Sequence, residues 1–507
     1  MNSIILFWLI ALPLVTAPAV YLLGRLRLAP VVAGTRQQVE VSNPLAYWAG
    51  LLALVVTWIP LVMAIPQVIA QGALTYTLGA VTLRLDGLSL LLAMVALGLG
   101  TLVMVYSGPY LSGEVGREKY FALLAMLVAV MIGLTCSGDL FNMWLWLEAL
   151  SVLAYLLVAF YREQPASLEA GVKYLAQSAV GSALVLLGIA LVLAQTGTLD
   201  LAQLREAATL TPGLLAAGAL FMIGFGVKIA LAPMHTWLPD AHAQAPSGIS
   251  AMLSGVVIEA ALVALLRVLA ALASVSLSWG GLLIGFGLLN VMAGNLLALR
   301  QTQVKRLLAF SSLSHVGYIL LGLGVGFYSG EIAGIQGGLF HLITHGLMKS
   351  LAFLAAGSLL YALHVATGSH SPLTIGDLNG AAKRYPLVAL TLSIALLGLG
   401  GLPPLAGFMS KWQILVAGFE TRSVVLMVVM VVAALNSVLS LGYYAPLVNA
   451  VYRLEPSEAV LRGKPLAVGM YIPLALLALA VVVLGFWPSL VNWLTEPAAQ
   501  TLLTVMK

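Results

Sequence analysis

Apolar stretches of roughly 20 residues recur along the whole chain and alternate with short polar connections. A helix needs about 20 apolar residues to cross the hydrocarbon layer of a bilayer. With 61% hydrophobic and only 8% charged residues, the chain has too little polar surface to cover a soluble globule of its length. Membrane β-barrels show alternating short strands instead. The sequence therefore predicts an all-α polytopic membrane protein.

Hydropathy divides the chain into about fourteen transmembrane segments within a single integral membrane domain, residues 1–507. The first apolar stretch lacks a basic leader and a small-residue cleavage site, so it is interpreted as a span rather than a signal peptide. Segment 67–85 alternates like a strand and predicts a small external hairpin. The spans are expected near 4–24, 44–66, 86–107, 120–137, 140–161, 170–194, 213–232, 248–270, 279–299, 306–327, 332–363, 386–419, 423–447 and 468–488.

The basic residues are distributed unequally between the two sides of this arrangement. Alternating the connections across the membrane places fifteen of the 23 Lys and Arg residues on one side and five on the other. The positive-inside rule makes the richer side cytoplasmic, which predicts both termini on the outside of a prokaryotic plasma (inner) membrane. The single cysteine, Cys136, excludes an internal disulfide and an all-cysteine iron–sulfur site.

Three charged residues interrupt apolar helices: Glu148, Lys228 and Lys349. A charge at the bilayer centre costs at least about 2.5–3.5 kcal/mol on insertion scales, so such residues are generally functional. Ion transport is the function this predicts. Glu148 is the expected partner of Lys228, in a pair that binds or releases a proton when it opens. A static structural ion pair is the alternative.

A polar stripe runs along one helix of the second half of the chain. His341, His345 and Lys349 are spaced i, i+4 and i+8, which spreads them over only about 80° of a helix. The stripe is expected to face the interior of the bundle, where imidazoles beside an amine suit a proton relay. A metal site at the two histidines is disfavoured because no carboxylate or cysteine lies near them in sequence.

Further polar residues lie within or beside other spans. Glu259 is a second carboxylate in an apolar helix, and Arg267 follows on the same face about 12 Å away, too far for a direct pair. Lys411 and His315 join the candidate proton path, although helix packing is an equal explanation for His315. His235, Asp240 and His242 predict either a proton access point or solvated, capping side chains. Asp86 and Asp139 are expected to be N-caps.

Two spans are interrupted by proline and glycine at comparable places. The breaks lie in LAPMHTWLPDAHAQAPSG and in LGLGGLPPLAGFMSKW. Freed backbone groups cannot face lipid, so the breaks are expected within protein or against a hydrated cavity. Broken helices at matching positions of two halves indicate an inverted-repeat transporter.

Together these motifs resemble one family. SGDLFNMWLWLEAL, GVKIALAPMHTWLPDAHAQAPSG, KRLLAFSSLSHVGYILLG, HLITHGLMKSLAFLAAG and GLPPLAGFMSKWQIL are similar, in order and spacing, to the antiporter-like subunits of complex I, Mrp Na+/H+ antiporters and membrane-bound hydrogenases. The resemblance covers about residues 80–450. The length is similar to that of the Mrp D-type and complex I M/N-type subunits.

The resemblance implies a fold of fourteen helices with two inverted five-helix repeats, spans 4–8 and 9–13, and broken helices 7 and 12. The divisions are then 1–110 for three N-terminal helices, 118–270 and 277–447 for the repeats, and 448–507 for the last loop and C-terminal helix. It also implies partner membrane subunits and transport of protons, with Na+ open. No cofactor, metal or nucleic-acid partner is implied. The proton path comprises Glu148, Lys228, Glu259, His315, His341, His345, Lys349 and Lys411.

One residue departs from the family pattern: Glu259 stands where the family commonly has lysine. Whether Glu259 holds Lys228 or carries the proton itself stays open at this point. Two other functions also stay open, a stand-alone secondary transporter of a small solute and a structural membrane arm without conduction. The chain brings no redox centre of its own that the sequence reveals. It is therefore expected to be a pump or antiporter subunit, in which the parent complex is an antiporter, an NADH- or ferredoxin-oxidising complex, or a hydrogenase.

Overall fold

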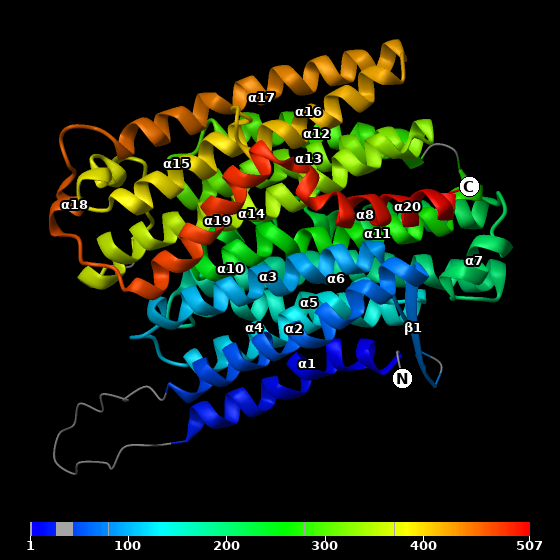
Figure 1. Cartoon of the computed structure of the whole chain (residues 1–507), viewed down its shortest axis with the longest axis horizontal. Helices are drawn as coiled ribbons and strands as arrows, with labels where there is room; N and C mark the ends of the chain where they lie inside the picture. Colours follow the sequence, from blue (N-terminus) through cyan, green and yellow to red (C-terminus); the bar gives the residue numbers. More distant parts are fainter. Residues whose placement is uncertain (1–2, 27–43, 80, 277–278, 370, 507) are drawn as a thin grey trace.

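The computed structural model describes residues 3–26, 44–79, 81–276, 279–369 and 371–506. Long helices run side by side along the longest axis of the molecule, with α1 and α2 at one edge and α17 at the other (Figure 1). Both chain ends lie at the end of the bundle that carries α7 and the β-hairpin, and α18 lies at the opposite end (Figure 1). The prediction of an all-α polytopic membrane protein is confirmed.

Apolar composition and length account for the long helices. Thirteen of the described helices are long and apolar enough to cross a membrane, and a bent pair at 376–400 brings the number up to fourteen. The thirteen are α1 (Ser3–Arg25), α2 (Leu45–Gln71), α3 (Gly87–Tyr110), α4 (Arg117–Thr135), α5 (Leu140–Val158), α6 (Pro165–Thr196), α8 (Pro212–Ile229), α10 with η1 and α11 (Ser247–Met252, Leu253–Val257 and Ile258–Ala271), α12 (Trp279–Ala298), α13 (Val304–Ser329), α14 (Ile332–Leu363), α17 (Val424–Val451) and α19 (Val468–Phe486). Two helices of 15 residues follow α14: α15 (Pro386–Gly400), which belongs to the bent pair, and α16 (Ala406–Glu420).

Shorter elements lie between the long helices or follow the last of them. They are α7 (Leu201–Ala207), α9 (Trp237–Gln244), α18 (Glu458–Arg462), α20 (Asn492–Met506), η2 (Ala273–Val275), η3 (Val365–Thr367), η4 (Gly376–Leu378), η5 (Ala381–Lys383) and η6 (Pro488–Val491). Helix α20 was not predicted, since its 15 residues are too few to span a bilayer. It packs along α3, where the backbone of Pro497 lies so close to Gly87 that a Cβ there would approach it within 2.5 Å.

The predicted breaks in spans 7 and 12 are both present. Helix α8 ends at Ile229 with Ala230 in the left-handed region at φ 59°, and α9 starts only at Trp237. Helix α15 ends before Gly401, at φ 80°, and α16 starts at Ala406. Prolines in both interruptions lack the N–H that would continue the helix. Each break therefore lies in the fourth span of its expected repeat.

A third irregularity was not visible in the sequence. Between α10 and α11 the backbone forms one turn of π-helix, η1, at Leu253–Val257. This turn crosses α14 at very close range, because a Cβ on Gly346 would lie 2.6 Å from the carbonyl oxygen of Gly255. Glycine at both positions allows the two backbones to approach, and this contact positions the residues that follow η1.

The predicted hairpin and the two predicted N-caps are present. Strands β1 (Ala73–Leu78) and β2 (Val81–Asp86) pair antiparallel, with Ala73 opposite Asp86. Helix α2 continues to Gln71 into the segment expected to be the hairpin. Asp86 caps α3 by accepting from the backbone N–H of Ser89, and Asp139 caps α5 in the same way through Asn142.

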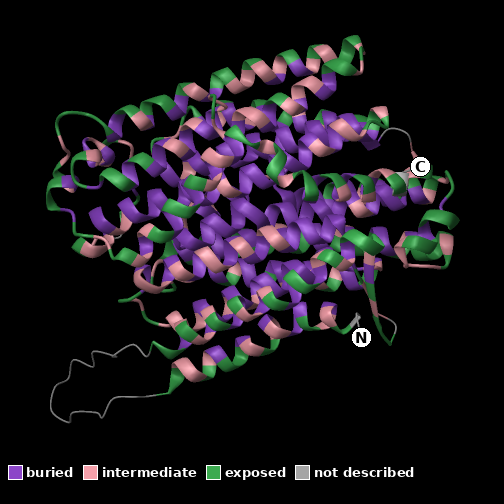
Figure 2. Cartoon of the chain, viewed as in Figure 1, coloured by how far each residue is buried: buried purple, intermediate pink, exposed green. Residues whose placement is uncertain are grey.

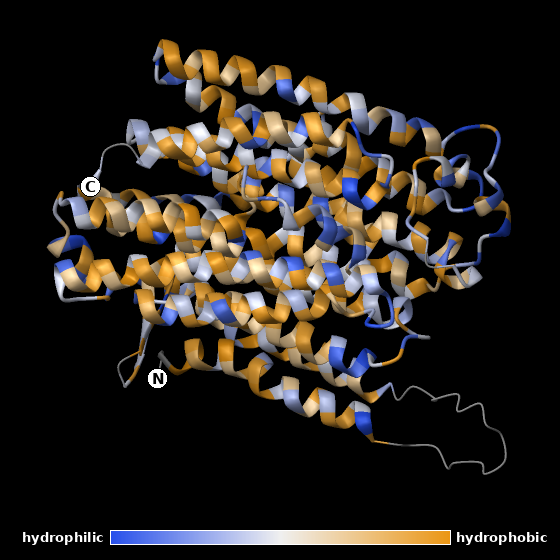
Figure 3. Cartoon of the chain, turned by 180° about the vertical axis from the view of Figure 1, so that it is seen from behind, coloured by the Kyte–Doolittle hydropathy of each residue, from blue (hydrophilic) through white to orange (hydrophobic). Residues whose placement is uncertain are grey.

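Burial is concentrated in the middle of the bundle, as the purple residues of Figure 2 show. Every residue of the most apolar 18-residue windows of Ser247–Ala271 and Val304–Ser329 is buried. From behind, apolar residues cover the long helices while hydrophilic residues gather at their ends and connections (Figure 3). The central helices α11, α13 and α14 therefore hold most of the buried polar side chains, although Arg306 near the start of α13 is 32% exposed.

Candidate functional site

Lys228 lies opposite Glu148, as predicted. Their Nζ and Oε1 atoms are 3.7 Å apart, and the Lys228 side chain is only 4% exposed. The ammonium also donates to the Ser151 hydroxyl at 2.7 Å and to the Ser178 hydroxyl. These three neighbours compensate for the loss of water around the buried amine.

Glu148 is less buried than the sequence predicted. Its side chain is 34% exposed, and its Oε1 accepts a hydrogen bond from Ser182 on α6. Leu145 and Val152, one turn away on either side, are exposed as well. Hydropathy describes a helix as a whole and does not reveal which face of α5 lies at the edge of the bundle. The carboxylate therefore lies on an otherwise apolar outer face of this chain.

Glu259 contacts His345 and not Lys228. The His345 Nδ1–H donates to Glu259 Oε1 at 2.8 Å, and neither side chain has any exposed surface. The second carboxylate oxygen, Oε2, and the His345 Nε2 have no hydrogen-bond partner among the described residues. The π-helical turn and its contact with Gly346 bring the carboxylate to α14. The pair thus has two free polar atoms in a fully buried position.

His315 on α13 joins the stripe on α14. Its Nδ1 lies 3.1 Å from His341 Nε2, and the two rings stack at 5.3 Å. His341 Nδ1 continues to the Ser410 hydroxyl at 2.8 Å on α16. The ring of His345 stacks on His315 at 5.4 Å. Three histidines from two helices therefore form one buried stack.

One assignment of the ring hydrogens gives every hydrogen bond of this stack the same direction, and the reverse assignment is equally consistent. Ser410 can donate to the carbonyl of Ala406, 3.1 Å away, and so accept from His341 Nδ1–H. His341 Nε2 is then an acceptor for His315 Nδ1–H. His315 Nε2 in turn faces the Tyr444 hydroxyl at 3.5 Å. Such an ordered row of donors and acceptors is the arrangement along which a proton passes between neutral imidazoles.

Lys349 lies on α14, one turn from His345, and its ammonium group contacts α13. Its Nζ donates to the Leu308 carbonyl at 2.9 Å and to the Ser311 hydroxyl, and the side chain is 0% exposed. No carboxylate pairs with it among the described residues. A lysine held only by neutral oxygens can lose its proton more readily than one in an ion pair.

Lys411 marks the far end of the row, beyond the second helix break. It donates to the Leu399 carbonyl at 2.8 Å and to the Ser437 hydroxyl at 2.9 Å. Its ammonium lies 4.6 Å from the centre of the Tyr318 ring. The freed carbonyl of Leu399 belongs to the last turn of α15, so the break itself supplies a ligand for the charge.

The predicted residues therefore form two groups. Glu148 and Lys228 make one, and Glu259, His315, His341, His345, Lys349 and Lys411 make the other. No hydrogen bond or ion pair in the described part of the chain joins Lys228 to Glu259. The hydroxyls of Ser410, Tyr444 and Tyr318 were missed, because a hydroxyl in an apolar helix has no distinctive sequence signal. Ser410 directly precedes Lys411, which is the one hint available.

The partner of Arg267 was also missed. Asp86, expected only to be an N-cap, accepts two bonds from the Arg267 guanidinium, at 2.6 and 3.0 Å. Burial raises the pKa of Asp86, but the charge and hydrogen bonds of Arg267 lower it by more, so the pKa lies below the ordinary value. As predicted, Arg267 does not pair with Glu259. This pair closes the bundle at the hairpin end and lies apart from the row of histidines.

Asp240 and its neighbours do not form one cluster with His235 and His242. Asp240 pairs with Lys173 at 2.9 Å and Arg306 at 2.5 Å. Burial raises the pKa of Asp240, but its hydrogen bonds to Lys173 and Arg306 lower the pKa by more. The pKa of Asp240 therefore lies below its ordinary value. His242 is fully buried instead, and its ring stacks on Phe353 at 4.7 Å. Asp240 is thus a partly solvated side chain, which was one of the two interpretations, whereas His242 is not solvated.

The sequence profile described as NADH:quinone oxidoreductase/Mrp antiporter, TM matches residues 137–437, which include both groups of site residues. A second profile, NADH-ubiquinone oxidoreductase (complex I), chain 5 N-terminus, matches residues 79–121. The chain belongs to this family of antiporter-like membrane subunits, as its motifs indicated.

Particular members of the family are similar over most of their length. Subunit N of the F(420)H(2) dehydrogenase of Methanosarcina mazei is 32% identical over 84% of this chain and 86% of its own. NADH-quinone oxidoreductase subunit N 1 of Sorangium cellulosum is 36% identical over 77% and 78%. Among solved structures, a chain of the membrane-bound sulfane sulfur reductase, an archaeal respiratory membrane complex, superposes with a TM-score of 0.87 at 27% identity over 99% and 98%.

Proposed function

We propose that this chain is a proton-translocating, antiporter-like subunit of a multisubunit membrane complex. The observation that carries the proposal is a row of buried titratable groups through α11, α13, α14 and α16. It consists of two hydrogen-bonded segments, Glu259–His345 and His315–His341–Ser410, which meet where the rings of His345 and His315 stack at 5.4 Å. Burying so many polar groups among apolar helices is costly. The close approach of the two segments supports proton transfer.

The Glu148–Lys228 pair is the proposed switch. At 3.7 Å the two charges attract each other without a close hydrogen bond, and the serines at Lys228 offer it neutral partners. When the pair is closed, the carboxylate stabilises the protonated amine. When it opens, the amine keeps only neutral neighbours and releases its proton more easily. The pair therefore has two states with different proton affinities.

The second group is the proposed conducting row. Glu259 shares a hydrogen bond with His345 and keeps Oε2 free, so it can take up a proton without breaking an existing bond. The contact favours proton carriage by Glu259 over a role in holding Lys228. From His345 the proton would pass through the stack of His315 and His341 toward Lys411, with Lys349 as the charge that sets its direction.

The partners are proposed from the outer face of α5. A partly exposed carboxylate on an apolar helix face is unfavourable in lipid, so we expect another membrane subunit to cover Glu148. The relatives named above are a subunit of an F(420)H(2) dehydrogenase, a subunit of an NADH-quinone oxidoreductase and a chain of an archaeal respiratory membrane complex. A redox module or further antiporter-like subunits would then supply the energy. The excess of basic residues supports a prokaryotic plasma-membrane orientation with both termini outside.

The repeat boundaries 118–270 and 277–447 belong to the same proposal. Each repeat would contain one of the two broken spans, and each break would lie beside one group of site residues. Lys411 uses the carbonyl of Leu399 at the second break. This equivalence supports transport by two related halves rather than a purely structural membrane arm.

The test is proton translocation by the intact complex in native membrane vesicles, with Lys349→Ala and Lys228→Ala. We expect at least about 100-fold loss, the lower end of what a positioned proton-transfer group contributes. The matched control is Lys464→Ala, which removes an exposed lysine. If both buried variants assemble and translocate protons like the parent, the proposal is wrong. Uptake of a solute by the chain alone in liposomes would favour a secondary transporter.

A further inference from the structure

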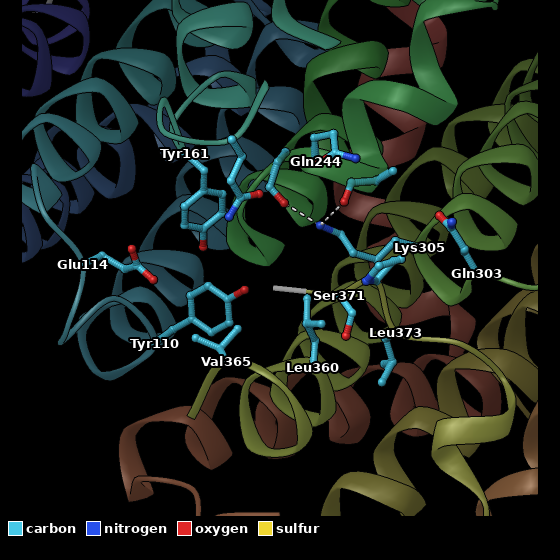
Figure 4. Close-up of a pocket in the computed structure, with 14 residues that line it drawn as sticks. Tyr110, Glu114, Tyr161, Gln244, Gln303, Lys305, Leu360, Val365, Ser371 and Leu373 are labelled. Atoms are coloured by element: carbon cyan, nitrogen blue, oxygen red, sulfur yellow. Dashed lines mark hydrogen bonds between the residues drawn. The ribbon is translucent and has the colours of Figure 1, made fainter. Parts of the chain in front are cut away.

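A polar cavity lies at the end of the bundle opposite the chain ends, the end that carries most of the basic residues. It has a volume of about 120 Å³, which is room for a few water molecules. Side chains from α3, α9, α13, α14 and the connections around them line it, among them Tyr110, Tyr161 and Lys305 (Figure 4). The polar lining includes Tyr110, Glu114, Tyr161, Gln244, Gln303 and Lys305.

Lys305 forms the inner wall of this cavity. The residue is 7% exposed, and its Nζ donates to the carbonyls of Ala243, at 3.4 Å, and of Ala245. Both carbonyls belong to the last turn and C-cap of α9, where the helix dipole favours a cation. The Lys305 amine is therefore hydrogen-bonded to Ala243, the residue that follows His242 in the chain.

His242 lies behind Lys305 and has no role in the path described so far. It is 0% exposed, and neither ring nitrogen has a hydrogen-bond partner within the described ranges. Two lysines lie around it: Lys305 on α13 donates to the carbonyl of the next residue, Ala243, and Lys349 on α14 is one helical turn from Phe353, on which His242 stacks. Burying an imidazole with both nitrogens unpartnered is costly, and its stacking on Phe353 does not compensate for that cost.

Helix α14 connects these features. Leu360 lines the cavity, Phe353 stacks on His242, and Lys349 is one turn further along the helix. Lys349 and Leu360 are separated by about 16 Å along the axis. A proton cannot cross that distance in one transfer, and His242 lies beside the helix between the two ends.

We propose that this cavity is the site of proton uptake from the basic side, with Lys305 and His242 as the relay that carries protons from its water to Lys349. The proposal rests on the proposed function and adds the route by which the row is loaded. A proton from cavity water first binds the neutral amine of Lys305 and then passes to one ring nitrogen of His242. The imidazolium that forms releases the proton on its other ring nitrogen to Lys349, once the Lys349 amine is neutral. No bond other than those to the proton changes.

The first test blocks the cavity. The chain has one cysteine, Cys136, which is fully buried, so an introduced cysteine is the accessible one. Ser371 lines the cavity and is exposed, and Ser371→Cys is a near-isosteric change. A membrane-impermeant sulfonate methanethiosulfonate, added to the basic side of vesicles holding the intact complex, is expected to lower proton translocation at least about 10-fold.

The matched control places the same thiol at the other end. Ser423 precedes α17, whose opposite end reaches the basic side near Arg453, so Ser423→Cys lies away from the cavity. Reagent on this variant is expected to change nothing. Complete modification of Ser371→Cys, verified by intact mass, with unchanged translocation would overturn the proposal.

The second test addresses the relay. His242→Phe preserves the stacking on Phe353 and removes both nitrogens, and we expect at least about 10-fold slower translocation. Ser250→Ala, which deletes the hydrogen bond to the His242 carbonyl, perturbs the same junction but should translocate normally. If His242→Phe does not assemble, Lys305→Gln is measured instead. If the assembled His242→Phe or Lys305→Gln variant translocates protons normally while Lys349→Ala is inactive, only this uptake route is refuted. If Lys349→Ala is itself active, the proposed function is refuted.

Discussion

The carboxylate of Glu259 accepts a hydrogen bond from His345 at 2.8 Å, and both side chains are completely buried. With a neutral imidazole donating to an ionised carboxylate, the pair carries one negative charge, and the uptake of one further proton makes it neutral. The pair is therefore a titratable site in the row, and proton uptake removes its buried net charge.

Replacing Glu259 is expected to affect proton translocation in a charge-dependent way. Glu259→Gln keeps an oxygen for His345 but cannot take up a proton, so we expect an assembled complex with translocation at least about 100-fold slower. Glu259→Lys, the residue common in the family, would place a cation against His345 Nδ1–H and near Lys349. We expect a loss of stability of about 3–5 kcal/mol, measured by thermal unfolding in detergent. A stable, active Glu259→Lys variant would contradict the pairing.

Ser410 is expected to contribute to stability through the stack. Ser410→Ala leaves His341 Nδ1 without a partner, whereas the Thr344 hydroxyl keeps its bond to the His341 carbonyl. An unsatisfied buried polar group costs about 1–3 kcal/mol, so the melting temperature of the complex should fall. Ser393→Ala is the control, because that hydroxyl bonds mainly within its own helix. Equal shifts for the two variants would mean that the stack adds nothing.

Gly346 is expected to tolerate no side chain. An added Cβ would meet the Gly255 carbonyl oxygen at 2.6 Å, and backbone cannot move away cheaply. Gly346→Ala should separate α14 from η1 and cost about 1–3 kcal/mol, together with slower translocation as Glu259 moves from His345. Gly285→Ala, where a Cβ would meet open space, serves as the comparison in the same thermal and translocation assays. An unchanged Gly346→Ala variant would show that this contact can relax.

The Asp86–Arg267 pair predicts a specific dependence of stability on pH. The folded-state pKa of Asp86 is below its ordinary value of 3.8, so the unfolded chain binds the proton more tightly. The stabilisation is therefore complete above that ordinary value and is lost as the pH falls through the lower folded pKa. Asp86→Asn should cost about 3–5 kcal/mol at neutral pH, because it leaves the Arg267 charge unpaired. The difference from the parent should shrink below about pH 4. A constant difference across this range would contradict the ion pair.

The sequence predicted the spans, the two breaks and nearly all charged members of the row. Hydropathy measures the transfer of each segment into lipid, and proline and glycine act on the local backbone, so both signals are local. The pairing of Glu259 with His345, and of Asp86 with Arg267, depends on contacts 86 and 181 residues apart. No local pattern carries that information. The exposure of Glu148 was misjudged for the same reason, since burial of a helix face is decided by its neighbours.

The π-helical turn at Leu253–Val257 has a consequence for the whole pathway. Each residue of an α-helix turns the next by about 100°, and a π-turn accommodates one extra residue within the same advance. Everything after η1 is therefore rotated by that amount relative to α10. Deleting one residue there would swing the carboxylate of Glu259 off α14 while keeping the composition of the helix almost intact. The phase of a single helix, set by one turn of backbone, selects the neighbour with which this acid exchanges its proton.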